Sequence, residues 1–307
     1  MSVTSVFHHH GLSALTFKQK PVFVIVFVCF YYYITHFRTC QYFFVAYFQQ
    51  NMSYPHVANR HLQQKSCLFL TLLAKEGTWV YNENKKRRQK MKYKTELHCH
   101  SKEGSGCASE TVERIVEKYV EAGYTTICLT NHLIPPKVYD YDAWVKKIEK
   151  QYSAFDLLKE TAGDKLIILL AFEIRINTAD HLLFGFDKEF LLNNYDLFVG
   201  DIATFSKKAR GDGMFLAQAH PFRPGVLRTD PELLDGIEVF NGHPEQNSHN
   251  ELAEQLAIES GKIMLSGTDH HDPHHIPNGG ISTDVPVTTI PQLIEIFKSG
   301  DYELLRG

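Results

Sequence analysis

Residues 92 to 100 read K-Y-K-T-E-L-H-C-H, from Lys92 to His100, and the interpretation of the whole chain starts from this stretch. The side chains of a β-strand alternate between its two faces. If the stretch is a strand, His98 and His100 lie on one face at its end, while Cys99 points to the other. Two imidazoles on one face provide half of a metal site. A half-buried strand with two hydrogen-bonded histidines is the alternative.

The sequence after this stretch alternates between helix-like and strand-like segments. A first helix, which Ser109 can cap and which ends at Gly123, is predicted from its apolar stripe. The stripe consists of Val112, Ile115, Val116, Tyr119 and Val120. Further strands are predicted at 124–130, 165–172, 181–186, 214–219, 236–240 and 262–266, and further helices at 142–161, 195–210, 246–260 and 290–298. This alternation predicts a parallel α/β architecture, and about seven repeats favour a barrel over an open sheet.

Histidines and acids stand at the ends of these predicted strands. They are His98, His100, His132, Glu173, His220, Asp269 and His271. The loops that follow the strands of a barrel share one rim, so these side chains are expected to converge. Neutral imidazole and carboxylate suit Zn, Mn or Fe, and Glu173 can bridge two cations. Two such cations can activate water and bind the oxygens of a phosphoryl group. Cys107 and Cys128 are interpreted as ordinary core or loop residues.

Six short motifs, taken in order, resemble a known family. They are H-C-H at 98–100, T-N-H at 130–132, F-E at 172–173, A-H-P at 219–221, E-V-F-N at 238–241 and G-T-D-H-H at 267–271. Each motif is weak alone, but the ordered set resembles the PHP family, which is named for polymerase and histidinol phosphatase. The likeness covers Met91 to Gly307 and none of residues 1–90.

The resemblance implies a distorted (β/α)7 barrel, similar to a TIM barrel, with a centre of two or three divalent Zn, Mn or Fe ions that hydrolyses phosphoesters. The positions that match the family's ligands are His98, His100, His132, Glu173, His220, Asp269 and His271. Asp269 is also expected to take part in catalysis.

Two places depart from the family pattern. Asn131 stands where the second motif usually has aspartate, which puts the role of that carboxylate in doubt but not the imidazole of His132. After the first motif the family commonly supplies an acid or a histidine. Glu103 is the nearest candidate ligand here, with a solvent-exposed loop glutamate as the alternative. His181 is a further candidate ligand, with a hydrogen-bonded strand histidine as the alternative.

Arg223 follows His220 by three residues in H-P-F-R-P-G. Its planar guanidinium is predicted to bind a phosphate oxygen. The alternative is a rim arginine that pairs with an acid. Further histidines are expected to lie on loops around the site, namely His243, His249, His270, His274 and His275.

The net charge of −3 conceals two different halves of this 307-residue chain. Residues 1–90 contain 11 Lys and Arg against two acids, whereas residues 91–307 contain 21 Lys and Arg against 33 acids. An acidic body disfavours broad nucleic-acid binding through surface charge. The six cysteines show no C-x-x-C motif, which favours a reducing compartment.

The first ninety residues contain an apolar and aromatic run over residues 22–48, with a polar break after residue 34. Its uninterrupted part is shorter than the roughly 20 residues of a membrane-spanning helix. A membrane anchor through residues 22–48 is therefore a hypothesis of second rank, and a real additional soluble segment is a third.

The favoured interpretation is that residues 1–90 are translated upstream DNA and not part of the fold. The basic run K-K-R-R-Q-K at residues 85–90 directly precedes Met91. Its Arg-Arg pair can be encoded by AGGAGG, a bacterial ribosome-binding sequence. Met91 would then be the true start, and residues 91–307 would be the phosphoesterase domain.

The sequence therefore predicts a cytoplasmic, metal-dependent phosphatase that acts on a phosphomonoester of a small metabolite or nucleotide. No stable nucleic-acid or membrane partner is expected. The rival functions are an oligonucleotide-trimming phosphodiesterase with the same metal centre and a non-catalytic module of the same fold. The substrate, the choice among Zn, Mn and Fe, and the oligomeric state do not follow from the sequence.

Overall fold

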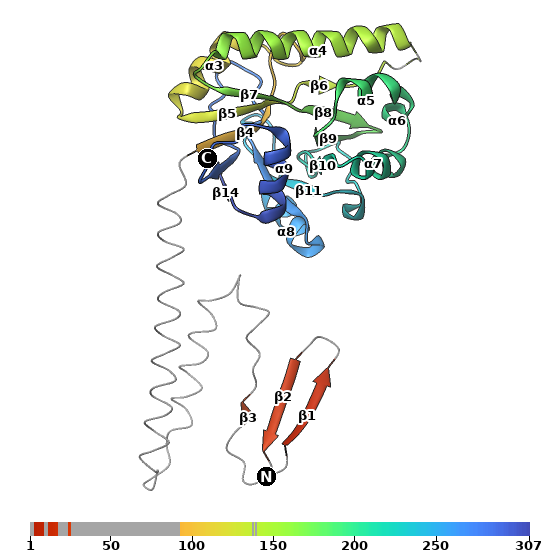
Figure 1. Cartoon of the computed structure of the whole chain (residues 1–307), viewed down its shortest axis with the longest axis vertical. Coiled ribbons are helices and arrows are strands. Elements are labelled where there is room, and N and C mark those ends of the chain that lie inside the picture. The colour runs from red at the N-terminus through yellow and green to blue at the C-terminus, as the bar shows by residue number, and fades with distance from the viewer. Residues whose placement is uncertain (1–2, 9–11, 18–23, 26–92, 137, 139) are drawn as a thin grey trace. The chain divides into compact units, whose positions relative to one another are not determined.

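The computed structural model describes residues 3–8, 12–17, 24–25, 93–136, 138 and 140–307 (Figure 1). The chain divides into two units, Met1–Trp79 and Val80–Gly307. In the first, strands β1 (Val3–His8), β2 (Leu12–Phe17) and β3 (Val24–Ile25) pair antiparallel in that order. Apart from Val24–Ile25, the segment 22–48 lies outside the described residues, as does the basic run before Met91. None of the described helices is long and apolar enough to cross a bilayer.

The second unit contains two sheets. One has the order β14-β13-β4-β5-β7 and the other the order β12-β11-β10-β9-β8-β6. The strands of the first sheet are β4 (Tyr93–Cys99), β5 (Tyr124–Leu129), β7 (Ile167–Leu170), β13 (Ile281–Thr283) and β14 (Glu303–Leu304). Those of the second are β6 (His132–Leu133), β8 (Phe172–Ile176), β9 (Ala179–Phe184), β10 (Phe215–Gln218), β11 (Gly236–Asn241) and β12 (Ile263–Gly267).

The chain passes directly from one sheet to the other at two points. Only Thr130 and Asn131 separate β5 from β6, and only Ala171 separates β7 from β8. The N–H of Thr130 still donates to Cys99 and the N–H of Ala171 to Leu129, both in the first sheet, whereas His132 and Glu173 pair with each other in the second. The candidate ligands His132 and Glu173 follow immediately, so the break between the sheets lies beside the site.

The predicted closed (β/α)7 barrel is not confirmed, because the described strands form two open sheets. Strands β4 and β12 lie side by side, but their ends meet only in an isolated bridge between Cys99 and His270. The purely parallel arrangement is wrong, since β9 pairs antiparallel with both β8 and β10. A two-residue turn after Ile176 joins β8 to β9, with Asn177 in the left-handed region. Such a turn can only reverse the chain, whereas a parallel pair needs a crossover.

The helices of this unit are α3 (Val112–Glu121), α4 (Tyr141–Ala162), α5 (Lys188–Asn193), α6 (Tyr195–Val199), α7 (Ile202–Gly211), α8 (Asn250–Ser260) and α9 (Ile290–Ser299), with a 3-10 turn η1 (Pro231–Leu233). Helix α5 was not predicted, and the helix predicted at 195–210 is divided into α6 and α7; the other helices occur near their predicted positions. The predicted cap of α3 is wrong. Thr111 holds the N-cap position, while the Ser109 hydroxyl donates to Asp272 and so ties two loops together. Val120, at the end of the apolar stripe, is 41% exposed.

The core lies on both sides of the strands. Helix α4 crosses β6 and β7 (Figure 1) and buries Trp144 and Ile148 against a cluster that includes Phe172 and Phe198. A second cluster gathers residues of β9, β10 and α9, among them Phe297. Burial of each such aromatic side chain stabilises the fold by roughly 1.5–3 kcal/mol. These two hydrophobic clusters fix the positions of the strand ends that carry the candidate ligand residues.

Candidate metal centre

Seven of the predicted ligand residues lie together at the strand ends. We call them the ligand cluster: His98, His100, His132, Glu173, His220, Asp269 and His271. All except His132 and His271 are at most 3% exposed as side chains, and these two are 19% and 10% exposed. Charged and titratable groups this deeply buried need partners. Their packing against one another is therefore the first evidence for a site.

Glu173 occupies the middle of the cluster. Its Oε1 lies 2.9 Å from His220 Nε2, and its Oε2 lies 3.0 Å from His132 Nδ1 and 3.2 Å from His100 Nε2. The two oxygens therefore face different histidines, as a carboxylate that bridges two cations would.

Asp269 provides the second carboxylate. Its Oδ1 lies 3.2 Å from His98 Nε2 and 3.3 Å from His100 Nε2, yet it is buried without a hydrogen-bond partner among the described residues. Its Oδ2 accepts from Arg223 Nη2 at 2.7 Å and from Asn241 Nδ2 at 3.2 Å. The backbone of Asp269 is in the left-handed region, with φ 55°. Strain of this kind collects at functional sites, where the surroundings hold the residue in place.

The tautomers of three histidines follow from their outer partners. His98 Nδ1 lies 2.8 Å from the carboxylate of Glu238, and His271 Nδ1 lies 2.9 Å from the carbonyl of Asp269. Both partners only accept, so both Nδ1 atoms carry the proton. His100 Nδ1 lies 3.1 Å from Ser105 Oγ, whose own proton points to Asn131 Oδ1 at 3.0 Å, so His100 Nδ1 also donates.

The Nε2 atoms of these histidines therefore carry lone pairs toward the centre. His98 Nε2 and His100 Nε2 lie 3.1 Å apart, and both face the carboxylate oxygens of Glu173 and Asp269. Lone pairs in such contact repel one another unless a proton or a cation lies between them. A proton on the outer nitrogen of a histidine is the usual arrangement around a bound metal. These residues therefore fit divalent cations.

The electrostatics point the same way. Burial alone would raise the pKa of Glu173, but the charges of His132 and His98 hold it well below its usual range. For His98 burial acts against the charged form, yet Asp269 and Glu238 raise its pKa well above the ordinary value. The carboxylates thus stay ionised in the buried centre and attract positive charge. Without a metal, a proton on His98 supplies that charge, and a divalent cation can take its place.

Glu96 positions the loop that carries Asp269. This fully buried carboxylate accepts from the N–H groups of His98 and Thr268, both at 2.9 Å, and from the Tyr119 hydroxyl at 2.9 Å. Strand β4 and the loop after β12 are held together by one side chain. The sequence shows Glu96 inside the alternating strand, two residues before His98, but its role needs Thr268, which is 172 residues away.

Arg223, the predicted phosphate ligand, pairs with an acid of the cluster. Its Nη2 contacts Asp269, Asn241 Oδ1 at 2.8 Å and Ser248 Oγ at 3.3 Å, while its Nε has no hydrogen-bond partner among the described residues. The guanidinium thus orients Asp269 and keeps donor capacity for another group.

The two less certain ligand candidates lie apart from these contacts. His181, on β9, places Nε2 2.8 Å from Thr229 Oγ1, and burial lowers its pKa to about 4. Glu103 lies on the loop after β4 and is half-buried, with Oε2 unpartnered among the described residues. Their predicted metal ligation stays a prediction.

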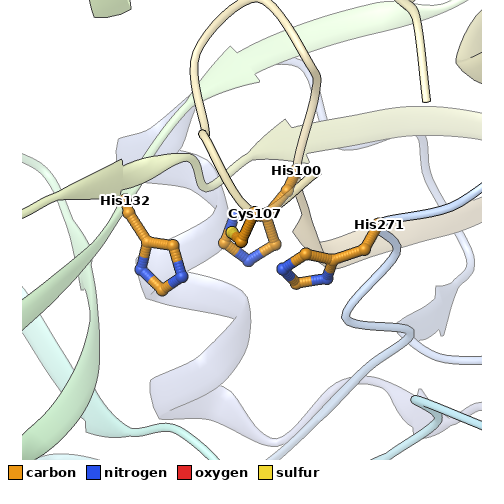
Figure 2. Close-up of side chains that lie close together, drawn as sticks. All are labelled: His100, Cys107, His132 and His271. Carbon is orange, nitrogen blue, oxygen red and sulfur yellow. The ribbon is translucent and has the colours of Figure 1, made fainter. Parts of the chain in front are cut away.

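Cys107 is the residue that sequence reasoning missed. Its sulfur belongs to a group with His100, His132 and His271 in which all potential ligand atoms lie within 4.8 Å of one another. Figure 2 shows these four side chains turned toward a common centre. Burial and the nearby Glu173 raise the pKa of the free thiol to about 11. The available signal was its place seven residues after His100, in the loop where an acid or histidine was expected.

A second group of histidines lies beside the ligand cluster. We call it the rim cluster: His243, Glu245, His274 and His275. Glu245 accepts from Nε2 of His274 and, at 2.9 Å, from Nε2 of His275. His275 Nδ1 accepts from the His271 N–H at 3.1 Å, so its proton is on Nε2. Donors and acceptors match at both ring nitrogens of His275, and this residue supports the loop of His271.

A cavity of about 460 Å³ opens beside both clusters. The described residues that line it are polar or charged apart from Cys107; they are Cys107, His132, Glu173, Arg175, Asp180, His220, Arg223, His243, Glu245, Gln246, Asp269, His271 and Asp272. Arg175 binds both oxygens of Asp180, at 2.6 and 2.9 Å.

The chain resembles several solved structures. A two-domain protein from Bacteroides vulgatus that contains a predicted PHP-like metal-dependent phosphoesterase is 18% identical over 70% of this chain, with TM-score 0.49; the chain spans 64% of its length. PsfC from Pseudomonas syringae is 13% identical over 70% of this chain and 91% of its own, with TM-score 0.52. An amidohydrolase from Chromobacterium violaceum is 12% identical over 69% of this chain and 98% of its own, with TM-score 0.39.

The likeness to PsfC supports the fold of the second unit. No protein-family model and no curated protein matches the sequence.

Proposed function

We propose that the protein is a metal-dependent phosphoesterase that hydrolyses a phosphomonoester of a small, polar metabolite. The ligand cluster would hold two or three divalent cations. One observation carries this proposal: lone pairs of His98 and His100 face each other at 3.1 Å and face two ionised carboxylates, with the outer nitrogens already protonated. Only positive charge between these groups makes the arrangement favourable.

Bound Zn, Mn or Fe ions would supply Lewis acidity, which activates water at neutral pH and neutralises charge on a phosphoryl group. The protein's own part is to hold the donors ready. Glu238 and Ser105 fix the orientation of the two histidines of the first motif. Arg223 fixes Asp269 and keeps an unpartnered Nε, which is suited to a phosphate oxygen.

The lining of the cavity supports a small substrate. Its described lining residues include five acids and two arginines, and imidazoles are their only aromatic rings. A nucleotide base would find no phenyl, phenol or indole ring on which to stack, and such stacking contributes about 1–3 kcal/mol per base. A small sugar or polyol phosphate would instead meet polar side chains throughout.

The test is a screen of the full chain, stripped of metal and then loaded separately with Zn, Mn or Fe. Release of inorganic phosphate is measured from a panel of phosphomonoesters, with nucleoside monophosphates and short oligonucleotides as comparison substrates. The proposal expects turnover of small phosphomonoesters that disappears with chelator and returns with metal. Cleavage restricted to oligonucleotides would support the phosphodiesterase instead. Metal content below one ion per chain would support the non-catalytic module.

A further inference from the structure

We propose that the sulfur of Cys107 binds one of the divalent cations of this centre, together with His132 and His271. The inference rests on the proposed metal centre and adds a ligand of a different chemical kind to it. It makes the centre a mixed one, with histidine and carboxylate ligands on one cation and a thiolate on another.

The geometry of the group fits one cation. Its ligand atoms all lie within 4.8 Å of one another, and the four side chains point to a common centre (Figure 2). Bonds of about 2.0–2.3 Å to a tetrahedral zinc place donor atoms about 3–4 Å apart. Small movements of the side chains on metal binding would bring the donors to that spacing.

One member of the group is already engaged elsewhere. His100 Nε2 lies within 3.3 Å of His98 Nε2, Glu173 Oε2 and Asp269 Oδ1, and a single lone pair binds one cation. His100 therefore belongs to the cation of that set. Cys107, His132 and His271 remain for a second cation. Three protein ligands and one position without a protein ligand are typical of catalytic zinc sites.

The loop holds Cys107 in place from both sides. Before it, Ser105 Oγ contacts His100 Nδ1, accepts from the His132 N–H at 2.9 Å and donates to Asn131. After it, the N–H groups of Ser109 and Glu110 both donate to the carbonyl of His271 at 3.0 Å. The contacts on either side of Cys107 are therefore made to the residues that would share its cation.

Thiolate ligation determines which metals this position prefers. On binding, the thiol releases its proton to solvent and the sulfur forms the metal bond. Soft thiolate ligands favour zinc and similar cations, whereas manganese and magnesium prefer oxygen ligands. We therefore expect this position to retain zinc under conditions in which manganese is lost.

Cobalt substitution tests the proposal without reference to activity. Full-length protein is stripped with chelator and titrated with Co²⁺ while its absorption spectrum is recorded. Thiolate ligation gives an intense near-ultraviolet charge-transfer band, in addition to the weak visible bands of any bound cobalt. We expect the intense band in the native protein, its loss in Cys107→Ser, and its persistence in Cys128→Ala, which alters a buried core cysteine.

The outcomes distinguish failure of ligation by Cys107 from failure of the proposed metal centre. Visible cobalt bands without the charge-transfer band would overturn ligation by Cys107 and leave the metal centre standing. A charge-transfer band that survives Cys107→Ser would also overturn it. Absence of all cobalt bands would contradict the proposed function itself.

Alkylation of the unmutated protein gives an independent measurement. Cys107 is exposed, so iodoacetamide can reach it in the stripped protein, and a reaction at about pH 9 offsets the raised pKa of its thiol. Added zinc, at a concentration about ten times its Kd, should slow modification of the peptide that contains Cys107 by about tenfold, as measured by mass spectrometry. Equal rates with and without zinc would contradict the proposal.

Discussion

The ligand cluster and the rim cluster are both rich in histidine and acid, but their protons are arranged in opposite ways. In the ligand cluster, His98 and His100 donate outward from Nδ1 and direct their Nε2 atoms toward ionised carboxylates. In the rim cluster, His275 accepts a backbone N–H at Nδ1 and donates from Nε2 to Glu245. The first arrangement needs a proton or a cation at its centre, whereas in the second both ring nitrogens of His275 already have matched partners.

The difference teaches how a metal centre can be told from a group of histidines that merely lie close together. Proximity of ligand atoms is similar in both groups, since His243, Glu245 and His275 also meet the spacing of a metal site. The outer partner of each imidazole decides, because it determines which nitrogen keeps a lone pair. Four changes test this distinction.

The largest effect is expected from removing the charge at the middle of the ligand cluster. In Glu173→Gln the amide cannot bind two cations, and the loss of several kcal/mol of electrostatic stabilisation lowers kcat/KM by about 10²–10⁴-fold. The matched variant Glu245→Gln, in the rim cluster, should keep its metal content and change kcat/KM less than about threefold. Elemental analysis and phosphate release measure both. Equal losses in the two variants would erase the distinction.

A smaller loss is expected from changing the outer partner of His98. Glu238 also accepts from the His220 N–H and from Asn241, so the amide of Glu238→Gln must turn a donor toward another donor. Disturbed partners of this kind typically reduce metal affinity by about 10–100-fold. Competition with a chromophoric chelator gives the affinity. An unchanged value would show that the outer proton on His98 does not matter.

The pH dependence of folding stability tests whether His181 is a metal ligand or a buried, neutral histidine. Its lowered pKa of about 4 means that the folded protein keeps it neutral while the unfolded chain takes up a proton below about pH 6.5. Folding stability should therefore fall with acid, by about 2 kcal/mol between about pH 7 and pH 5, and level off near pH 4. The free energy of unfolding is measured in urea on chelator-treated protein at each pH. The decrease due to His181 should be present in the native protein and absent in His181→Gln.

The comparison variant for this experiment is His249→Asn, at a partly exposed histidine, which should retain the acid dependence of the native protein. If metal added at neutral pH stabilises the native protein and His181→Gln equally, His181 is not a ligand. A smaller stabilisation of His181→Gln would support its predicted ligation.

The smallest effect is expected at Ser105. In Ser105→Ala, His100 loses the acceptor for its Nδ1 proton. The His132 N–H and Asn131 Oδ1 also lose a partner, but neither of these atoms faces the cations. The net loss of one such hydrogen bond is about 0.5–1.5 kcal/mol, which corresponds to a decrease in metal affinity of up to about tenfold. The same chelator competition measures it. A loss as large as that of Glu238→Gln would place the loop at residues 101–108 among the main supports of the centre.

Much of the fold could be predicted because its signals are local. The stripe of Val112, Ile115, Val116 and Tyr119 is buried in α3 as its spacing requires, and α4 and α9 occur where their patterns place them. A strand was predicted at the position of β9, but its antiparallel direction was not, because only Asn177, in the left-handed region, marks the tight turn that reverses the chain. Whether the sheet closes depends on long-range pairing of β4 with β12, which no local pattern encodes.

The candidate site was predictable where ligand residues stand at or close after the end of a strand, as His98 does in β4, His132 after β5 and Glu173 after β7. The sequence showed Glu238 only as part of a motif. Its contact with His98 could not be predicted, because the two residues are 140 positions apart. Cys107 lies in a loop without periodicity, and its position depends on hydrogen bonds to His132 and His271. The loop residue chosen from the sequence, Glu103, was nearer along the chain, but distance along a folded loop does not indicate which side chain reaches the centre.

By itself the sequence determined the kinds of ligand this protein offers and the face on which each stands, because side-chain alternation and helix periodicity depend only on neighbouring residues. The tertiary structure alone decided which histidine nitrogens are free, which cysteine joins them and which of the two histidine groups needs a proton or a cation at its centre. Those properties depend on hydrogen bonds between segments far apart in the chain, and such bonds exist only after the strands have brought their ends together.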